Sequence, residues 1–245
     1  MEPTGYLDAV QREAAAFAAA ARAGVGARVP TCPDWSVGEL TVHLGTIHRW
    51  VAETVRTCAT ERVKGRDERW AIDASRPDLV EWYEESAREL QGVLAAADPS
   101  APVWTFAPDG TVRFWYRRQA VETAIHRWDA ENAHGSAGQI DGDLAAAGVE
   151  EYLAGFGATL RSMSTAEGRG ESFHFHATDT PCEWLVTFEG DGMHVEPGHA
   201  KGDVAVRGKA SLLLLFLWHR IGSDRLEVFG DDELLGRWFD FVPSP

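Results

Sequence analysis

The spacing of apolar residues changes once along this 245-residue chain, and that change constrains the fold more than any other feature. Up to about residue 160, apolar side chains recur every three to four positions, which is the period of an amphipathic helix. After a polar, glycine-containing stretch at 164–171 they alternate or cluster in short runs between turn residues, as strands do. The sequence therefore predicts an α+β protein, with a helical domain at 1–165 and a small α+β domain at 166–245.

The first part is expected to contain helices at about residues 5–23, 36–57, 113–134 and 143–160, and one more that begins at Pro77. Ser36 and Glu39 have the spacing of a capping box, and Gly135 follows the 113–134 helix as a C-terminal stop. The four helices before residue 135, joined by loops that include a charged one at 60–75, indicate a four-helix bundle.

The second part alternates short strands with turns. Strands are expected near residues 173–175, 184–188, 193–195, 204–206 and 226–229, with helices at 210–221 and 231–241. This pattern is typical of a small α+β unit.

Charge and composition exclude several classes of protein. The net charge is −15 and no basic stripe is present, so we expect no nucleic-acid partner. The three cysteines, Cys32, Cys58 and Cys182, are too scattered for a disulfide framework. The N-terminus is acidic where a secretory signal would be basic, and the longest apolar run, at 212–218, is far shorter than a membrane span of about 20 residues. We therefore expect a cytoplasmic protein without membrane segments.

Glu122 and His126 form the strongest candidate for chemistry. They lie four residues apart, so on a helix they share one face and can offer a carboxylate oxygen and an imidazole nitrogen to the same ion. The helix at 36–57 offers a third ligand, His43 or His48, and periodicity cannot choose between them. Two imidazoles and a carboxylate would form an open zinc site. The alternative is that the Glu-x-x-x-His pair is exposed or structural, as such pairs more often are. Asp129, three residues after His126, would orient that imidazole, or is simply a solvated acid.

The amino-acid sequence around these residues is more specific than their spacing. Residues 29–45, with a Trp-x4-Leu-x-x-His element, and residues 118–130, with Glu-x-x-x-His, resemble the mycothiol-dependent maleylpyruvate isomerase family, which is related to the DinB-like helical metalloproteins. The resemblance implies a DinB-like bundle followed by a sterol-carrier-like domain. It also implies that the metal ligands are His43, Glu122 and His126, which selects His43 over His48.

The same resemblance implies two arginines near the substrate and the thiol. Arg220, at the end of the helix expected at 210–221, matches a family arginine that reaches the substrate carboxylate; the alternative is a cation that caps the helix end. A second arginine comes from the region after the second helix, where Arg66 is our choice over Arg62 and Arg69.

In such a family, a divalent metal, with zinc as our first choice, binds the thiol of mycothiol as a thiolate. The expected function is isomerisation or S-transfer on a small electrophilic substrate that bears a carboxylate. The expected partners are therefore this substrate and the thiol, with the chain a monomer or homodimer. Two alternatives remain open: a metal-dependent hydrolase that activates water, and a non-catalytic, metal-stabilised module that binds an apolar ligand.

Overall fold

The computed structural model describes residues 1–107 and 109–243, except for the side chain of Asp67. The chain divides into two compact units, Met1–Ile140 and Asp141–Pro245. Each unit packs around its own set of elements, and each is described by itself below.

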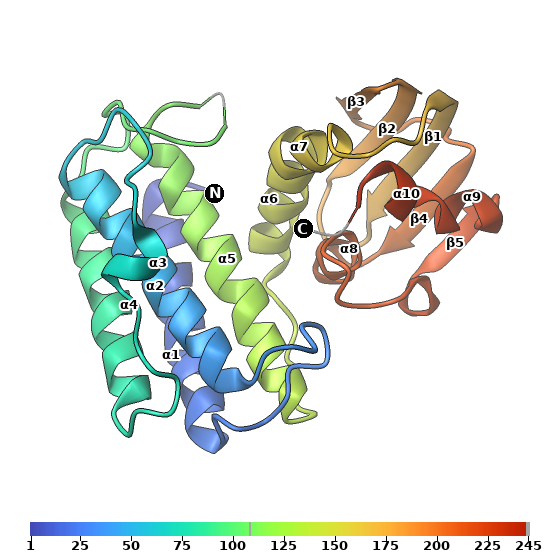
Figure 1. Ribbon diagram of the computed structural model, residues 1–245. Coiled ribbons are helices and arrows are strands. Elements are labelled where there is room, and N and C mark those ends of the chain that lie inside the picture. The colour runs from blue at the N-terminus through green and yellow to red at the C-terminus, as the bar shows by residue number, and fades with distance from the viewer. Residues whose placement is uncertain (108, 244–245) are drawn as a thin grey trace. The chain divides into compact units, whose positions relative to one another are not determined.

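Four long helices form the first unit among residues 1–107 and 109–140, and Figure 1 shows them side by side. They are α1 (Pro3–Ala23), α2 (Val37–Arg56), α4 (Leu79–Ala96) and α5 (Val112–Ala133). Helix α1 packs on α5 and α4, and α2 packs on α4 and α5. The predicted four-helix bundle is confirmed. A short helix, α3 (Arg66–Arg69), lies in the segment that the sequence predicted to be an irregular loop.

Helix α2 begins where its capping box predicts. The backbone amide of Ser36 donates to Glu39 Oε2 at 2.6 Å, and the amide of Glu39 donates to Ser36 Oγ at 3.3 Å. Further along the helix, a Cβ added at Gly45 would lie only 2.2 Å from Cζ3 of Trp82. Glycine at this position therefore allows α2 and α4 to approach closely.

A buried ion-pair network joins α1 to α5. Arg127 Nε donates to Glu13 Oε2 at 2.8 Å, and Nη1 donates to Glu131 Oε2 at 2.7 Å. The remaining guanidinium donors reach the carbonyls of Gly138 and Gln139, each at 3.1 Å. Burial opposes the charge, but the two carboxylates outweigh it and raise the pKa of Arg127. The network thus gives the buried guanidinium of Arg127 partners on α1, on α5 and in the segment after α5.

The second unit is built on a mixed sheet. Its strands run in the order β3-β2-β1-β4-β5, with β1 and β4 parallel and the other neighbours antiparallel. The strands are β1 (Gly168–Ala177), β2 (Glu183–Gly190), β3 (Gly192–Pro197), β4 (Val204–Gly208) and β5 (Glu227–Gly230). The helices are α6 (Gly142–Glu151), the π-helical η1 (Tyr152–Phe156), α7 (Gly157–Arg161), α8 (Ala210–Leu217), the 3-10 turn η2 (Ser223–Arg225), α9 (Asp232–Gly236) and α10 (Trp238–Phe241). The predicted α+β fold class is confirmed.

One face of this sheet forms the core of the second unit. Phe173 and Phe175 of β1 are fully buried and pack edge-on against Trp238 of α10. Phe188 of β2 stacks on Phe241 with ring centroids 4.5 Å apart. Because side chains alternate along a strand, the residues between these aromatics point to the opposite face.

The helices of the second unit differ in detail from the prediction. The expected helix at 143–160 is present but passes through the π-helical turn η1. The expected last helix at 231–241 is two short ones, α9 and α10, which meet at Arg237. By contacts α6 groups with the second unit, where it packs on α8. The domain boundary that we placed after residue 165 stays a prediction.

Helix α8 ends at Leu217, four residues earlier than predicted. His219 has a left-handed backbone with φ of 58°, and its amide donates to the carbonyl of Phe216 at 2.9 Å. The amide of Arg220 donates to the carbonyl of Leu215 at 2.8 Å. These two bonds form a Schellman motif, which terminates a helix. Arg220 therefore lies just beyond α8.

Within residues 1–107 and 109–243, none of the helices combines the length and the hydropathy that crossing a membrane requires.

Candidate metal centre

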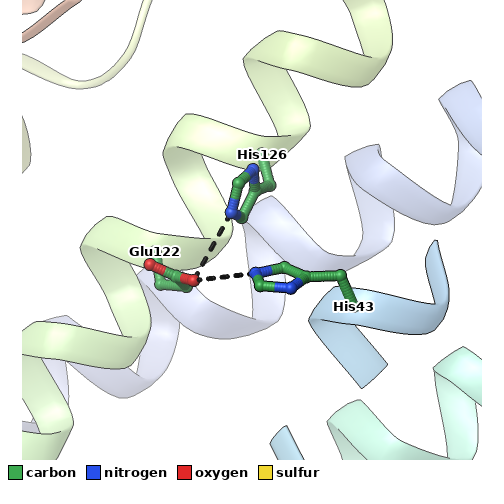
Figure 2. Close-up of side chains that lie close together, drawn as sticks. All are labelled: His43, Glu122 and His126. Atoms are coloured by element: carbon green, nitrogen blue, oxygen red, sulfur yellow. Dashed lines mark ion pairs between the residues drawn. The ribbon is translucent and has the colours of Figure 1, made fainter. Parts of the chain in front are cut away.

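Three side chains from α2 and α5 meet inside the first unit. Figure 2 shows one carboxylate oxygen of Glu122 joined by dashed lines to both histidines. Nε2 of His43 lies 3.6 Å from Glu122 Oε1, and Nε2 of His126 lies 3.4 Å from the same oxygen. The structure thus brings together the three residues that the family resemblance selected.

The spacing of these atoms suits a single ion. One ligand atom from each residue lies within 4.8 Å of the other two, and the rings of His43 and His126 are nearly perpendicular, at 82°. In a tetrahedral zinc site with bonds of about 2.0–2.1 Å, ligand atoms are separated by about 3.3 Å. The distances to Glu122 Oε1 are close to that value. Two imidazole nitrogens and one carboxylate oxygen also leave a coordination position open.

Asp129 determines which nitrogen of His126 is free to bind an ion. Its Oδ2 lies 3.0 Å from Nδ1 of His126, and its Oδ1 accepts a hydrogen bond from Thr31 Oγ1 at 2.7 Å. A fully buried carboxylate in this position holds the proton on Nδ1, so the lone pair is on Nε2, which faces Glu122. The contact between Asp129 and His126, which their three-residue spacing suggested, is present. Thr31, which supports it, was missed, because the segment before α2 shows no helical period.

Arg118 was also missed in the sequence. It is buried, and its guanidinium pairs with Oε2 of Glu122 one turn away on α5. This pairing leaves Oε1 of Glu122 directed at the two histidines. The signal was available, because Arg118 lies four residues before Glu122 on the same helical face.

His48 belongs to the core and not to this cluster. Its Nε2 lies 3.1 Å from Thr123 Oγ1, whose own proton is donated to the carbonyl of Gln119 at 2.7 Å. The hydroxyl therefore accepts from His48, which assigns the proton to Nε2. Burial, with smaller contributions from the imidazoles of His126 and His43, lowers the pKa of His48 to about 3. His48 is thus a neutral core residue.

A cavity of about 310 Å³ opens beside His43. It is lined by Trp35, Glu39, Val42, His43, Thr46, Arg66, Ala71, Ile72 and Ala74. The ring of Trp35 lies 4.8 Å from that of His43. Arg66 of α3 shares this cavity with His43, whereas Arg69 pairs with Glu53 at 3.3 Å. The cavity is large enough for part of a small ligand, with one cation and one candidate metal ligand in its wall.

Arg220 lies in the second unit. Its Nη1 donates to the carbonyl of Trp218 at 2.8 Å, so it performs the helix-capping role that was the alternative in the sequence. The substrate-binding role of Arg220 stays a prediction.

Comparison with known proteins assigns the family. The family model described as the mycothiol maleylpyruvate isomerase N-terminal domain matches residues 7–131. The chain belongs to the mycothiol-dependent maleylpyruvate isomerase family. The C-terminal domain model of this enzyme family matches residues 143–237, so the two models cover most of the chain. In a comparison with curated proteins, none matches.

Two solved structures support the family's fold for this chain. A crystal structure of the mycothiol-dependent maleylpyruvate isomerase has a TM-score of 0.65 at 14% identity and covers 93% of both chains. That of a histidine-to-alanine variant has a TM-score of 0.64 at 15% identity, also with 93% of both chains covered. At such low identity the likeness establishes the fold alone, so residue roles rest on the geometry above.

Proposed function

We propose that this member of the mycothiol-dependent maleylpyruvate isomerase family binds one divalent metal ion, with zinc as the first choice, through His43, Glu122 and His126. The metal would hold the thiolate of mycothiol for reaction with a small electrophilic substrate that carries a carboxylate. The reaction is isomerisation or S-transfer.

One observation carries this proposal: Asp129 and Arg118 prepare the two ligands of α5 for a cation. Asp129 holds the proton of His126 on Nδ1, and Arg118 pairs with Oε2 of Glu122. The remaining donor atoms are Nε2 of His126 and Oε1 of Glu122. Both lie close together, and Nε2 of His43 lies beside Glu122 Oε1. Outer partners of this kind orient the ligands of metal sites, and the carboxylate of Asp129 also raises the basicity of the His126 imidazole.

A bound divalent cation supplies the charge that deprotonates a coordinating thiol near neutral pH. The cavity residues supply the rest. Arg66 lines the same cavity as His43, and its guanidinium could hold a carboxylate there by paired hydrogen bonds. Trp35 and Ile72 give the same cavity apolar surface, which limits water around the reacting sulfur. For Arg220, in the second unit, we propose only the role that the family resemblance implies, which is binding of a substrate carboxylate. A cytoplasmic location fits a thiol that must stay reduced.

The first experiment measures metal content by elemental analysis on protein purified without metal affinity or added metal. About one equivalent is expected at this centre in the parent, and its loss is expected in His43→Ala and Glu122→Gln. His48→Gln is the matched control, because His48 lies on the same helix but outside the cluster. Equal metal in Glu122→Gln and the control would refute the ligand assignment.

The second experiment separates the thiol-dependent enzyme from a hydrolase. Cobalt(II) is substituted for the native metal, and the absorption spectrum is recorded before and after mycothiol is added. A new sulfur-to-cobalt charge-transfer band, lost in Glu122→Gln, supports thiolate binding. Turnover of electrophilic substrates that proceeds equally without thiol would favour the activated-water alternative.

A further inference from the structure

A second group of metal-binding side chains lies in the second unit, on the face of the sheet opposite its aromatic core. His174 and His176 alternate with Phe173 and Phe175 along β1, so the two histidines share the opposite face. Glu183, the first residue of β2, is the register partner of His176. Strand alternation and register thus bring two imidazoles and a carboxylate together.

The turn after β3 adds a third imidazole. The amide of Gly198 donates to the carbonyl of Glu183 at 2.9 Å, which brings this turn over the start of β2. Nδ1 of the next residue, His199, lies 2.8 Å from Glu183 Oε2. The same oxygen lies 2.9 Å from His174 Nε2 and 3.1 Å from His176 Nδ1. Three imidazole nitrogens therefore converge on one carboxylate oxygen.

Hydrogen bonding accounts for part of this convergence, since His199 Nδ1 lies within hydrogen-bond distance of Glu183 Oε2. A carboxylate oxygen has two lone pairs, fewer than the three nitrogens around it. His174 is 5% exposed, and its Nε2 makes no hydrogen bond among residues 1–107 and 109–243, despite its short distance to Glu183. A cation bound beside Glu183 would give this buried nitrogen a partner.

We propose that His174 Nε2, Glu183 Oε2 and His199 Nδ1 form a second divalent-metal site, separate in its residues from the one on α2 and α5. One ligand atom from each of the three lies within 4.8 Å of the other two. The separations from Glu183 Oε2, 2.9 and 2.8 Å, are about half an ångström shorter than the roughly 3.3 Å of tetrahedral zinc, so the side chains would move apart slightly to admit the ion.

The donor set selects the metal. Imidazole and carboxylate together suit zinc and other late transition metals, whereas calcium and magnesium prefer oxygen ligands. The third histidine, His176, holds the carboxylate from its register position. Three protein ligands leave one position for water, and His199, with a side chain 81% exposed, places that position near the surface. The ion would tie the β3–β4 turn to β1 and β2.

Zinc titration against a chromogenic chelator tests this site, in a Glu122→Gln background that removes the first site. About one equivalent of zinc is expected to bind. His199→Gln should weaken that binding by roughly 100-fold or more, because even an outer partner of a ligand is worth about 10–100-fold. Since the His199 side chain is mostly exposed, this variant retains the fold. Thermal unfolding should shift upward with zinc in the background protein and not in His199→Gln.

His194→Gln is the matched control, because His194 is exposed on the neighbouring strand β3 and outside the group. It should bind zinc like the background protein. Two results would overturn the proposal: no stoichiometric zinc in the Glu122→Gln background, or equal affinity in His199→Gln and His194→Gln. Because the first site is absent throughout, neither result bears on the function proposed for it.

Discussion

His48 should make the first unit sensitive to acid. The residue is fully buried, and its pKa is lowered from 6.5 to about 3. Its Nε2–H is bonded to Thr123, and its Nδ1 has no hydrogen-bond partner among residues 1–107 and 109–243. Protonation would therefore place an unsatisfied charge in the core, which the folded state resists.

The sign and size of the effect follow from proton linkage. Below pH 6.5 the unfolded chain binds a proton at this histidine and the folded chain does not, so stability falls as the pH falls. The contribution of neutral His48 to the free energy of unfolding is fully present above pH 6.5 and is lost progressively as the pH falls toward about 3. At pH 5 the loss is about 1.5 × 1.36, or about 2 kcal/mol, and at pH 3, where the folded histidine is itself half protonated, it is about 4 kcal/mol. A metal ion bound at the nearby centre would lower the pKa of His48 further.

The assay is urea unfolding of the parent and of His48→Gln at pH 7.5, 6 and 5, with chelator present. Glutamine does not titrate, so any constant cost of the substitution cancels when the pH dependence is compared. The parent should lose about 2 kcal/mol more than the variant between pH 7.5 and 5. His194→Gln, at an exposed site, should follow the parent. Parallel pH profiles for the parent and His48→Gln, or an NMR titration that places the folded pKa near 6.5, would refute the reasoning.

Three further changes test the packing, a helix end and the metal centre. Gly45→Ala places a methyl group 2.2 Å from Trp82 and should cost about 1–3 kcal/mol in urea unfolding. Cys58→Gly should stabilise by about 1 kcal/mol in the same assay, because exposed Cys58 ends α2 with a left-handed φ of 46°. Asp129→Asn should weaken metal binding by about 10–100-fold in a chelator titration, since it removes the charge that orients His126.

Each of these changes has a matched control. Gly92→Ala on α4, with open space around its added Cβ, should be neutral or stabilising, and a cost equal to that of Gly45→Ala would contradict the packing argument. Cys58→Ala keeps the Cβ, so it should gain nothing relative to the parent. Asp34→Asn, at an exposed position, should leave metal affinity unchanged, and Asp129→Asn should not behave like it.

Local sequence patterns predicted the parts of this fold that depend on neighbours along the chain. The helical period predicted both ends of α1, α2 and α5 to within one or two residues. The capping box at Ser36 specified the start of α2, because its hydrogen bonds join residues only three positions apart. The end of α8 was missed because His219, and not glycine, adopts the left-handed turn.

The sequence by itself determined the pair Glu122 and His126, since one turn of helix brings residues four apart together. It could not choose between His43 and His48, because both flank the apolar stripe of α2. Packing decided this: His48 turns into the core beside Thr123, and His43 faces Glu122.

Tertiary structure alone supplied the contacts between distant segments. Thr31 reaches Asp129 across 98 residues, and Arg66 joins the cavity of His43 only because α3 folds back against α2. The group around Glu183 depends on strand register and on the path of the turn that carries His199. Periodicity along a chain carries information about which face a residue occupies, but which faces meet depends on how the elements pack.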